Sequence, residues 1–86
     1  MVKKSVKKKF NIIIYKTATC SYCHLAEEFL KENNISFKSI DVGNDQKAAQ
    51  EMIKKSGQMG VPVIDINGKL ILGFDKSALK KILGIV

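Results

Sequence analysis

The residues best suited to chemistry in this sequence are its two cysteines, which are separated by two residues in the segment Thr19-Cys20-Ser21-Tyr22-Cys23-His24. A thiol pair at this spacing can close a small disulfide, and beside a strand–helix pattern it is typical of a redox motif. An apolar run precedes the segment and a helical pattern follows it. A helix that begins near Cys20 would stabilise a thiolate there through its free N–H groups and dipole. We therefore expect Cys20 to be the nucleophile and Cys23 the resolving thiol.

Three other interpretations of this segment fit the sequence less well. Two buried structural thiols would explain neither the spacing nor the context. The order Cys-x-x-Cys-His also occurs at haem attachment sites, and Met52 or Met59 would then be the axial ligand in this chain. Covalent haem attachment of this kind requires export of the protein. A zinc site needs about four ligands, and His24 would be only the third ligand after the two cysteines. We expect His24 to lie on a helix surface, with modulation of the thiolate as the alternative.

The chain has the length of one small domain, and its charge is unevenly distributed. The net charge is +7, and residues 1–9 contain five lysines and no acidic residue. The chain has no arginine, and no aromatic residues interleave with these lysines, which disfavours a nucleic-acid arm. We expect residues 1–9 to form a flexible basic tail and residues 10–86 to form the folded domain.

The hydropathy pattern indicates neither export nor membrane insertion. No stretch approaches a signal peptide or an apolar span of about 20 residues. We therefore expect a soluble, cytoplasmic monomer that contacts neither membranes nor nucleic acid. In a reducing compartment a lone cysteine pair rarely forms a structural disulfide, so the pair favours redox or metal chemistry.

Apolar periodicity and turn residues predict the order strand, helix, strand, helix, strand, strand, helix. The strands are expected over residues 10–15, 35–42, 61–66 and 69–72, with Asn67-Gly68 as a hairpin turn. The first two strands should be parallel, because a helix connects them through a right-handed crossover.

The helices are delimited by their capping residues. The first runs from about Cys20 to Asn33-Asn34, the second from a cap at Asn44 or Asp45 to Gly57, and the third begins at Asp75. Their buried stripes are expected to be Tyr22, Leu25, Ala26, Phe29 and Leu30, then Ala48, Ala49, Met52 and Ile53, then Ala78, Leu79, Ile82 and Leu83.

Three motifs in this order resemble the glutaredoxin family of the thioredoxin fold. They are Cys20-Ser21-Tyr22-Cys23-His24 after a strand, Gly60-Val61-Pro62, and Gly73-Phe74-Asp75 before a short final helix. The likeness covers residues 10–86 and implies an α/β, thioredoxin-like fold of order βαβαββα, with a four-stranded mixed sheet flanked by helices. It also implies a cis Val61–Pro62 bond that faces the cysteines, with the Val61 backbone pairing with bound substrate.

The resemblance further implies a dithiol thiol–disulfide oxidoreductase, which passes electrons from glutathione or a thioredoxin reductase to protein disulfides. The substrate-binding residues that it implies are Lys16, Ser21, Tyr22, Val61, Pro62, Gly73, Phe74 and Asp75. Four of these also have ordinary structural roles: Lys16 as a loop lysine, Tyr22 and Phe74 as packing residues, and Asp75 as a helix cap.

Departures from the family pattern bear on the reductant. Typical glutathione-using members carry a lysine three residues before the first cysteine, where this chain has Thr17, and further polar or acidic residues after the late glycine, where Lys76 follows Asp75. Gly73-Phe74 instead resembles redoxins that are reduced by thioredoxin reductase and serve ribonucleotide reductase or peroxidases.

We expect no resident metal and no tightly bound cofactor, with glutathione as a co-substrate. Ser21 replaces the usual proline between the cysteines. A similar motif occurs in glutaredoxins that hold a [2Fe-2S] iron–sulfur cluster between two subunits with glutathione. An iron–sulfur cluster carrier is therefore the alternative function.

Overall fold

The computed structural model describes residues 10–85, and the elements follow the predicted order. The strands are β1 (Ile12–Lys16), β2 (Lys38–Asp41), β3 (Val63–Ile66) and β4 (Lys69–Leu72), and the helices are α1 (Ser21–Glu32), α2 (Gln46–Ser56) and α3 (Lys76–Leu83). The basic tail expected over residues 1–9 lies outside the described residues. No helix in the described part is long and apolar enough to span a membrane.

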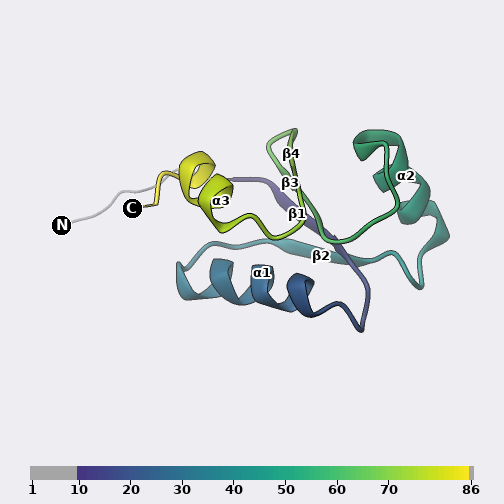
Figure 1. Ribbon diagram of the computed structural model, residues 1–86, viewed down its shortest axis with the longest axis horizontal. Coiled ribbons are helices and arrows are strands. Elements are labelled where there is room, and N and C mark those ends of the chain that lie inside the picture. The colour runs from purple at the N-terminus through teal and green to yellow at the C-terminus, as the bar shows by residue number, and fades with distance from the viewer. Residues whose placement is uncertain (1–9, 86) are drawn as a thin grey trace.

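The four strands form one mixed sheet in the order β2-β1-β3-β4 (Figure 1). β1 and β2 are parallel, as predicted, whereas β3 is antiparallel to both β1 and β4. Tyr15 near the end of β1 pairs with Val63 at the start of β3, and Val63 pairs with Leu72 at the end of β4. The segments that follow β1, precede β3 and follow β4 therefore meet at one end of the strands, which we call the Cys20 edge.

Three strands are shorter than the sequence predicts, and β1 runs over Ile12–Lys16 rather than residues 10–15. The predicted second strand begins at Ile35, but the Ile35 N–H donates to the Leu30 carbonyl (2.9 Å) and closes the end of α1. The predicted third strand begins at Val61, but Pro62 has no N–H to donate and β3 starts after it. Asn34 ends the α1 region with a φ of 58°, in the left-handed conformation that asparagine tolerates.

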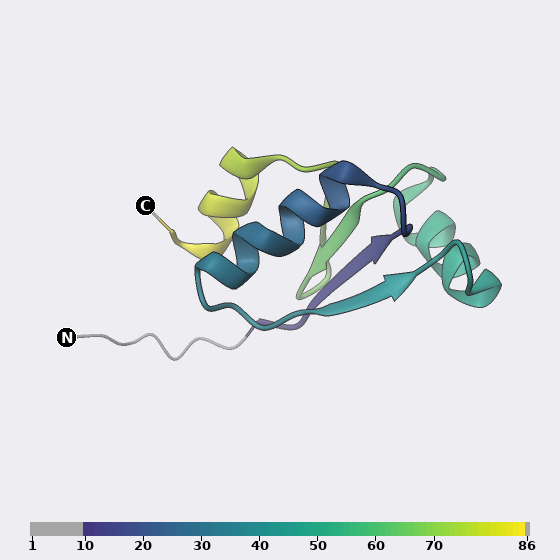
Figure 2. The same cartoon turned by 90° about the horizontal axis from the view of Figure 1, so that it is seen from below.

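The helices cover the two faces of the sheet separately. α1 and α3 lie side by side in Figure 2, and both pack on the face that carries Ile12, Ile14 and Ile64. α2 packs on the opposite face, where Met52 contacts a smaller core with Tyr15 and Val63. The core therefore surrounds the central strands β1 and β3 on both sides.

The buried face of α1 differs from the predicted stripe. Its buried residues are Cys23, Ala26, Phe29 and Leu30. Tyr22 and Leu25 are 63% and 44% exposed. The placement of Leu25 in the core was therefore wrong, and for Tyr22 the packing alternative is wrong. The reason is that Cys23 occupies the position against the sheet, which turns these two side chains outward. In α2, Ala48 and Met52 are buried as predicted, whereas Ile53 is exposed.

A polar contact fastens the end of α2 to the sheet. The Lys55 ammonium donates to the Tyr15 hydroxyl (2.8 Å) and to Asp65 Oδ2 (3.0 Å), while Asp65 Oδ1 accepts from the Gly68 N–H (2.8 Å). The hydrogen bonds to Tyr15 and then to Asp65 raise the pKa of Lys55 above its ordinary value. Asp65 is buried, so its carboxylate depends on these donors.

Replacing Lys55 by methionine should therefore lower the free energy of unfolding by about 1–2 kcal/mol, because Asp65 would lose its charged partner. Urea denaturation at neutral pH measures this change. Lys54→Met is the matched control, since Lys54 is the neighbouring exposed lysine in the last turn of α2. Equal stability losses in the two variants would contradict the role assigned to Lys55.

Candidate functional site

Cys20 occupies the N-cap of α1, directly after the short connection from β1. Its backbone is extended (φ −86°, ψ 109°), and its Sγ accepts from the Cys23 N–H at 3.1 Å. A helix N-terminus offers unpaired N–H groups and the positive end of the dipole, which favour a thiolate over a thiol. The predicted position of the nucleophile is therefore the position in which a cysteine is most readily ionised.

Cys23 lies one turn further along α1 and is fully buried. It is joined to Cys20 by a disulfide, with the two Cα atoms 5.2 Å apart. Cys20 is only partly buried, so a substrate can reach Cys20 and not Cys23. Cys20 is therefore the accessible sulfur of the pair, and Cys23 is the internal one.

The Val61–Pro62 segment lies at the same edge of the sheet as Cys20. Its peptide bond is cis, as the resemblance implied. The Pro62 carbonyl accepts from the Gly73 N–H at 2.8 Å, which holds the segment after β4 against the segment before β3. Gly73 has a φ of 79°, a conformation that side-chain-bearing residues rarely adopt.

Within residues 10–85, no hydrogen bond uses the N–H or the carbonyl of Val61. Val61 precedes β3 and is only partly buried. Both backbone groups are therefore available to an extended segment of another molecule, in the way that an added strand pairs with a sheet edge.

Phe74 and Asp75 contribute mainly to structure. The Phe74 ring lies edge-on to Phe29 of α1, with 6.2 Å between centroids. Asp75 caps α3 by accepting from the Ala78 N–H (3.1 Å), as predicted. The Lys76 ammonium lies 5.8 Å from the centroid of Phe29. Phe74 is partly exposed, so one part of its ring still faces outward beside the edge.

Lys16, the last residue of β1, forms an ion pair with Glu27 of α1 (Nζ to Oε2, 3.0 Å). Glu27 also accepts from the Ser39 hydroxyl, and its Oε1 lies 3.7 Å from His24 Nδ1. Burial alone would raise the pKa of Glu27, but the hydrogen bonds from Ser39 and Lys16 bring it below its ordinary value. The carboxylate is therefore ionised at neutral pH and neutralises Lys16.

Glu27 was not predicted as a residue of the site, and the predicted buried stripe of α1 excluded it. Its signal is the spacing, because Cys23, Glu27 and Leu30 stand at i, i+4 and i+7, on the face turned to the sheet. Sequence alone shows neither Lys16 nor Ser39 across that interface, because both partners come from separate strands.

The remaining predicted residues lie on the exposed side of the motif. Ser21 and Tyr22 are exposed in the first turn of α1. His24 is also exposed, as predicted, and its Nε2 lies 3.3 Å from the Ala18 carbonyl oxygen. Met59, named above only for the haem alternative, is 77% exposed in the loop before Pro62.

The donor set does not fit a metal centre built by one chain. In the described part of the chain, no three His, Cys, Asp or Glu side chains are grouped so that they could hold a metal ion. With Cys23 buried, one chain offers a single accessible thiolate.

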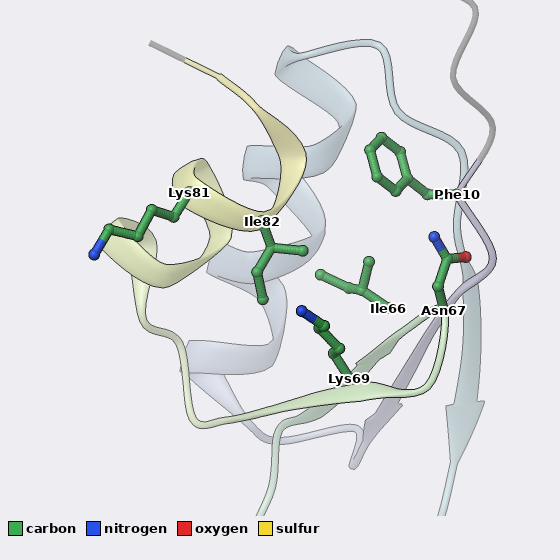
Figure 3. Close-up of a pocket in the computed structure, with 6 residues that line it drawn as sticks. All are labelled: Phe10, Ile66, Asn67, Lys69, Lys81 and Ile82. Carbon is green, nitrogen blue, oxygen red and sulfur yellow. The ribbon is translucent and has the colours of Figure 1, made fainter.

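A shallow hollow of about 460 Å³ lies at the opposite end of the strands (Figure 3). Its lining residues are Phe10, Ile66, Asn67, Lys69, Lys81 and Ile82. Phe10 precedes β1 and Asn67 follows β3, so the hollow lies away from the edge that carries Cys20. It is not part of the cysteine site.

Comparison with known proteins agrees with this geometry. The model of the glutaredoxin family matches residues 12–71. A glutaredoxin-like 8.6 kDa protein from a rubredoxin operon of Clostridium pasteurianum is 44% identical over 72 residues, which cover 84% of this chain and 96% of that protein. Glutaredoxin 3 of Escherichia coli is 38% identical over 65 residues, which cover 76% of this chain and 78% of that protein.

Solved structures show the same fold. The crystal structure of a glutaredoxin from Archaeoglobus fulgidus superposes with a TM-score of 0.78 at 27% identity, and the match covers 85% of each chain. The thioredoxin-like fold, predicted from the order of elements and the motifs, is therefore confirmed. Together with the cysteine pair at the N-terminus of α1, these matches show that the chain belongs to the glutaredoxin family, whose members are generally thiol–disulfide oxidoreductases.

Proposed function

We propose that this protein is a dithiol thiol–disulfide oxidoreductase in which Cys20 attacks the substrate and Cys23 resolves the intermediate. The observation that carries the proposal is the asymmetry of the pair. Cys20 Sγ accepts from the backbone at the helix N-terminus and is partly exposed, whereas Cys23 is fully buried one turn away.

The reaction consists of two exchanges and a reductive return step. The Cys20 thiolate attacks one sulfur of a substrate disulfide, which forms a mixed disulfide and releases the other sulfur as a thiolate. Cys23 then attacks Cys20 Sγ and gives its proton to the departing substrate sulfur, which forms the Cys20–Cys23 disulfide and releases the second half of the substrate as a thiol. Two electrons have passed to the substrate, and a thiol reductant or a reductase restores them to the pair.

The edge of the sheet provides a place for the substrate chain. The unpaired backbone groups of Val61 can hold an extended segment beside Cys20, while Pro62 and Gly73 fix the position of Val61. Tyr22 is exposed and Phe74 is partly exposed, and both add apolar surface to the site. A protein disulfide in an exposed, extended loop would fit this edge, and ribonucleotide reductase or a peroxidase is the proposed class of partner.

Either glutathione or a thioredoxin reductase could supply the electrons, and the site favours the reductase. Recognition of glutathione depends on charged contacts, but Lys16 is paired with Glu27 and the Asp75 carboxylate accepts from the Ala78 N–H. Thr17 offers no charge. A protein reductant instead relies on backbone pairing and apolar contact, which this edge supplies.

The roles of the two cysteines are tested by single replacements. Cys20→Ser should lower disulfide reduction to background, because no other accessible thiolate exists in the described part of the chain. In the Cys23→Ser variant, Cys20 should attack the substrate once, and the reaction should then stop. One half of the substrate remains covalently bound to Cys20. Mass spectrometry of the unreduced product detects this adduct. Trapping on position 23 in Cys20→Ser, or full turnover by that variant, would contradict the assignment.

The reductant is tested by coupled assays of the oxidised protein with NADPH and an insulin disulfide substrate. One assay contains glutathione and glutathione reductase, and the other contains thioredoxin reductase. We expect the higher kcat/KM with thioredoxin reductase, because Lys16 is paired with Glu27, Thr17 carries no charge, and the site offers a protein backbone pairing and apolar contact. Efficient turnover with glutathione alone would show that Lys16 and Asp75 do not limit its binding.

The alternative function, an iron–sulfur carrier, would need two chains and two glutathione molecules, since each chain supplies one accessible thiolate. No contact in the described residues favours that assembly over thiol exchange. Anaerobic purification followed by visible absorption and gel filtration tests it directly. We expect a colourless monomer, and a brown dimer that loses its colour when glutathione is removed would support the carrier instead.

A further inference from the structure

The lysine closest in sequence to Cys20 is neutralised by an ion pair within the protein. Lys16 ends β1 four residues before Cys20, and no other lysine lies as near to Cys20 along the chain. Because strand residues alternate, Lys16 faces the same side of the sheet as Ile12 and Ile14, under α1. There its ammonium meets the Glu27 carboxylate, one helical turn beyond Cys23.

No other carboxylate near this edge forms an ion pair with Lys16 in the described residues. Asp41 is the strand neighbour of Lys16 in β2, but its oxygens accept from the Gly43 N–H (2.9 Å) and from Asn44 Nδ2 (2.9 Å). Asp75 is the cap of α3. Within residues 10–85, Glu27 is the only carboxylate in ion-pair contact with Lys16.

Glu27 is also well held in this position. Its side chain is 13% exposed, and it accepts from the Ser39 hydroxyl as well as from Lys16. These contacts join α1, β1 and β2 at one point. The pair is therefore a fixed part of the site's electrostatics, in contrast to a surface ion pair that solvent screens.

We propose that Glu27 is a specificity-determining residue, because by neutralising Lys16 it lowers the rate at which the Cys20 edge reacts with anionic disulfides relative to cationic ones. The inference rests on the proposed function, since it concerns which disulfides the Cys20 thiolate accepts. Glu27 acts through Lys16 and touches no reacting atom, so it is a positioning residue for this charge.

The physical basis is the long range of the Coulomb interaction near a partly buried site. An uncompensated ammonium at roughly 8–10 Å from a reacting group, at an effective dielectric constant of about 40, changes the rate with a singly charged reactant by about fourfold to sixfold. Substrates of opposite charge shift in opposite directions. The ratio of their rates therefore reports the charge, whereas general damage to the fold lowers both rates together.

The test is the single-turnover rate of reduced protein with two small disulfides at low ionic strength. Dithiobis(nitrobenzoate) carries two carboxylates, and cystamine carries two ammonium groups. Because the two rates shift in opposite directions, Glu27→Gln should raise the anion-to-cation rate ratio by about tenfold or more over the wild type, and added salt should abolish the difference. Glu28→Gln is the matched control, because it removes the same charge from an exposed neighbour on α1 and should leave the ratio within about twofold.

Two further variants separate charge from structure. Lys16→Met leaves Glu27 uncompensated and should lower the ratio, whereas Lys16→Met combined with Glu27→Gln removes both charges and should restore the wild-type value. Glu27→Asp keeps the charge and should keep the ratio, even if the protein is less stable. Urea denaturation checks that every variant is folded at the assay temperature.

The outcomes distinguish the two claims. If Glu27→Gln and Glu28→Gln give the same ratio, or if Lys16→Met and Glu27→Gln shift it in the same direction, the inference about Glu27 is wrong and the oxidoreductase function stands. If the folded wild-type protein reduces neither disulfide at a rate above that of free thiol, the proposed function itself fails.

Discussion

The contact between Cys20 Sγ and the Cys23 N–H at the start of α1 is the interaction on which the rest of the structure depends. It places one sulfur of the pair over the unpaired end of a helix and leaves the other buried beneath it. Helix ends carry N–H groups without internal partners, so a sulfur atom there replaces solvent as acceptor. Two identical side chains thereby acquire different chemistry from their positions alone.

The sheet supplies the rest of the site through its register. Because β1 runs antiparallel to β3 and β3 to β4, the connection to Cys20, the Val61–Pro62 segment and Gly73 all come to one edge. A hydrogen bond from Gly73 to Pro62 fixes two of these segments to each other. The hydrophobic cores on both faces hold the strands that set this arrangement, while the edge itself stays open to a substrate chain.

Local rules predicted most of the fold. The caps at Asp45 and Asp75, the stop at Gly57 and the turn at Asn67-Gly68 each depend on a few neighbouring residues, and the structure confirms all of them. The cis bond before Pro62 came from the family resemblance, because composition and spacing do not determine it.

The errors arose where long-range packing decides the outcome. Leu25 fits a helical apolar stripe, yet it is exposed because Cys23 takes the inward position. Glu27 has an ordinary charged helix pattern, and only its contacts with Lys16 and Ser39 show that it belongs to the site. Lys16, predicted as a substrate contact or a loop lysine, instead ends β1 and is paired with Glu27. The charge around the nucleophile thus depends on partners that are distant in sequence.

The most direct test of the account is the pH dependence of alkylation of the fully reduced protein by iodoacetamide, with the modified cysteine identified by mass spectrometry. The account predicts that Cys20 is modified first, with a thiol pKa well below the value of about 8.5 for an unperturbed cysteine, while Cys23 is protected by burial. Modification of Cys23 first, or a pKa of Cys20 at the ordinary value, would contradict the central role of the helix N-terminus.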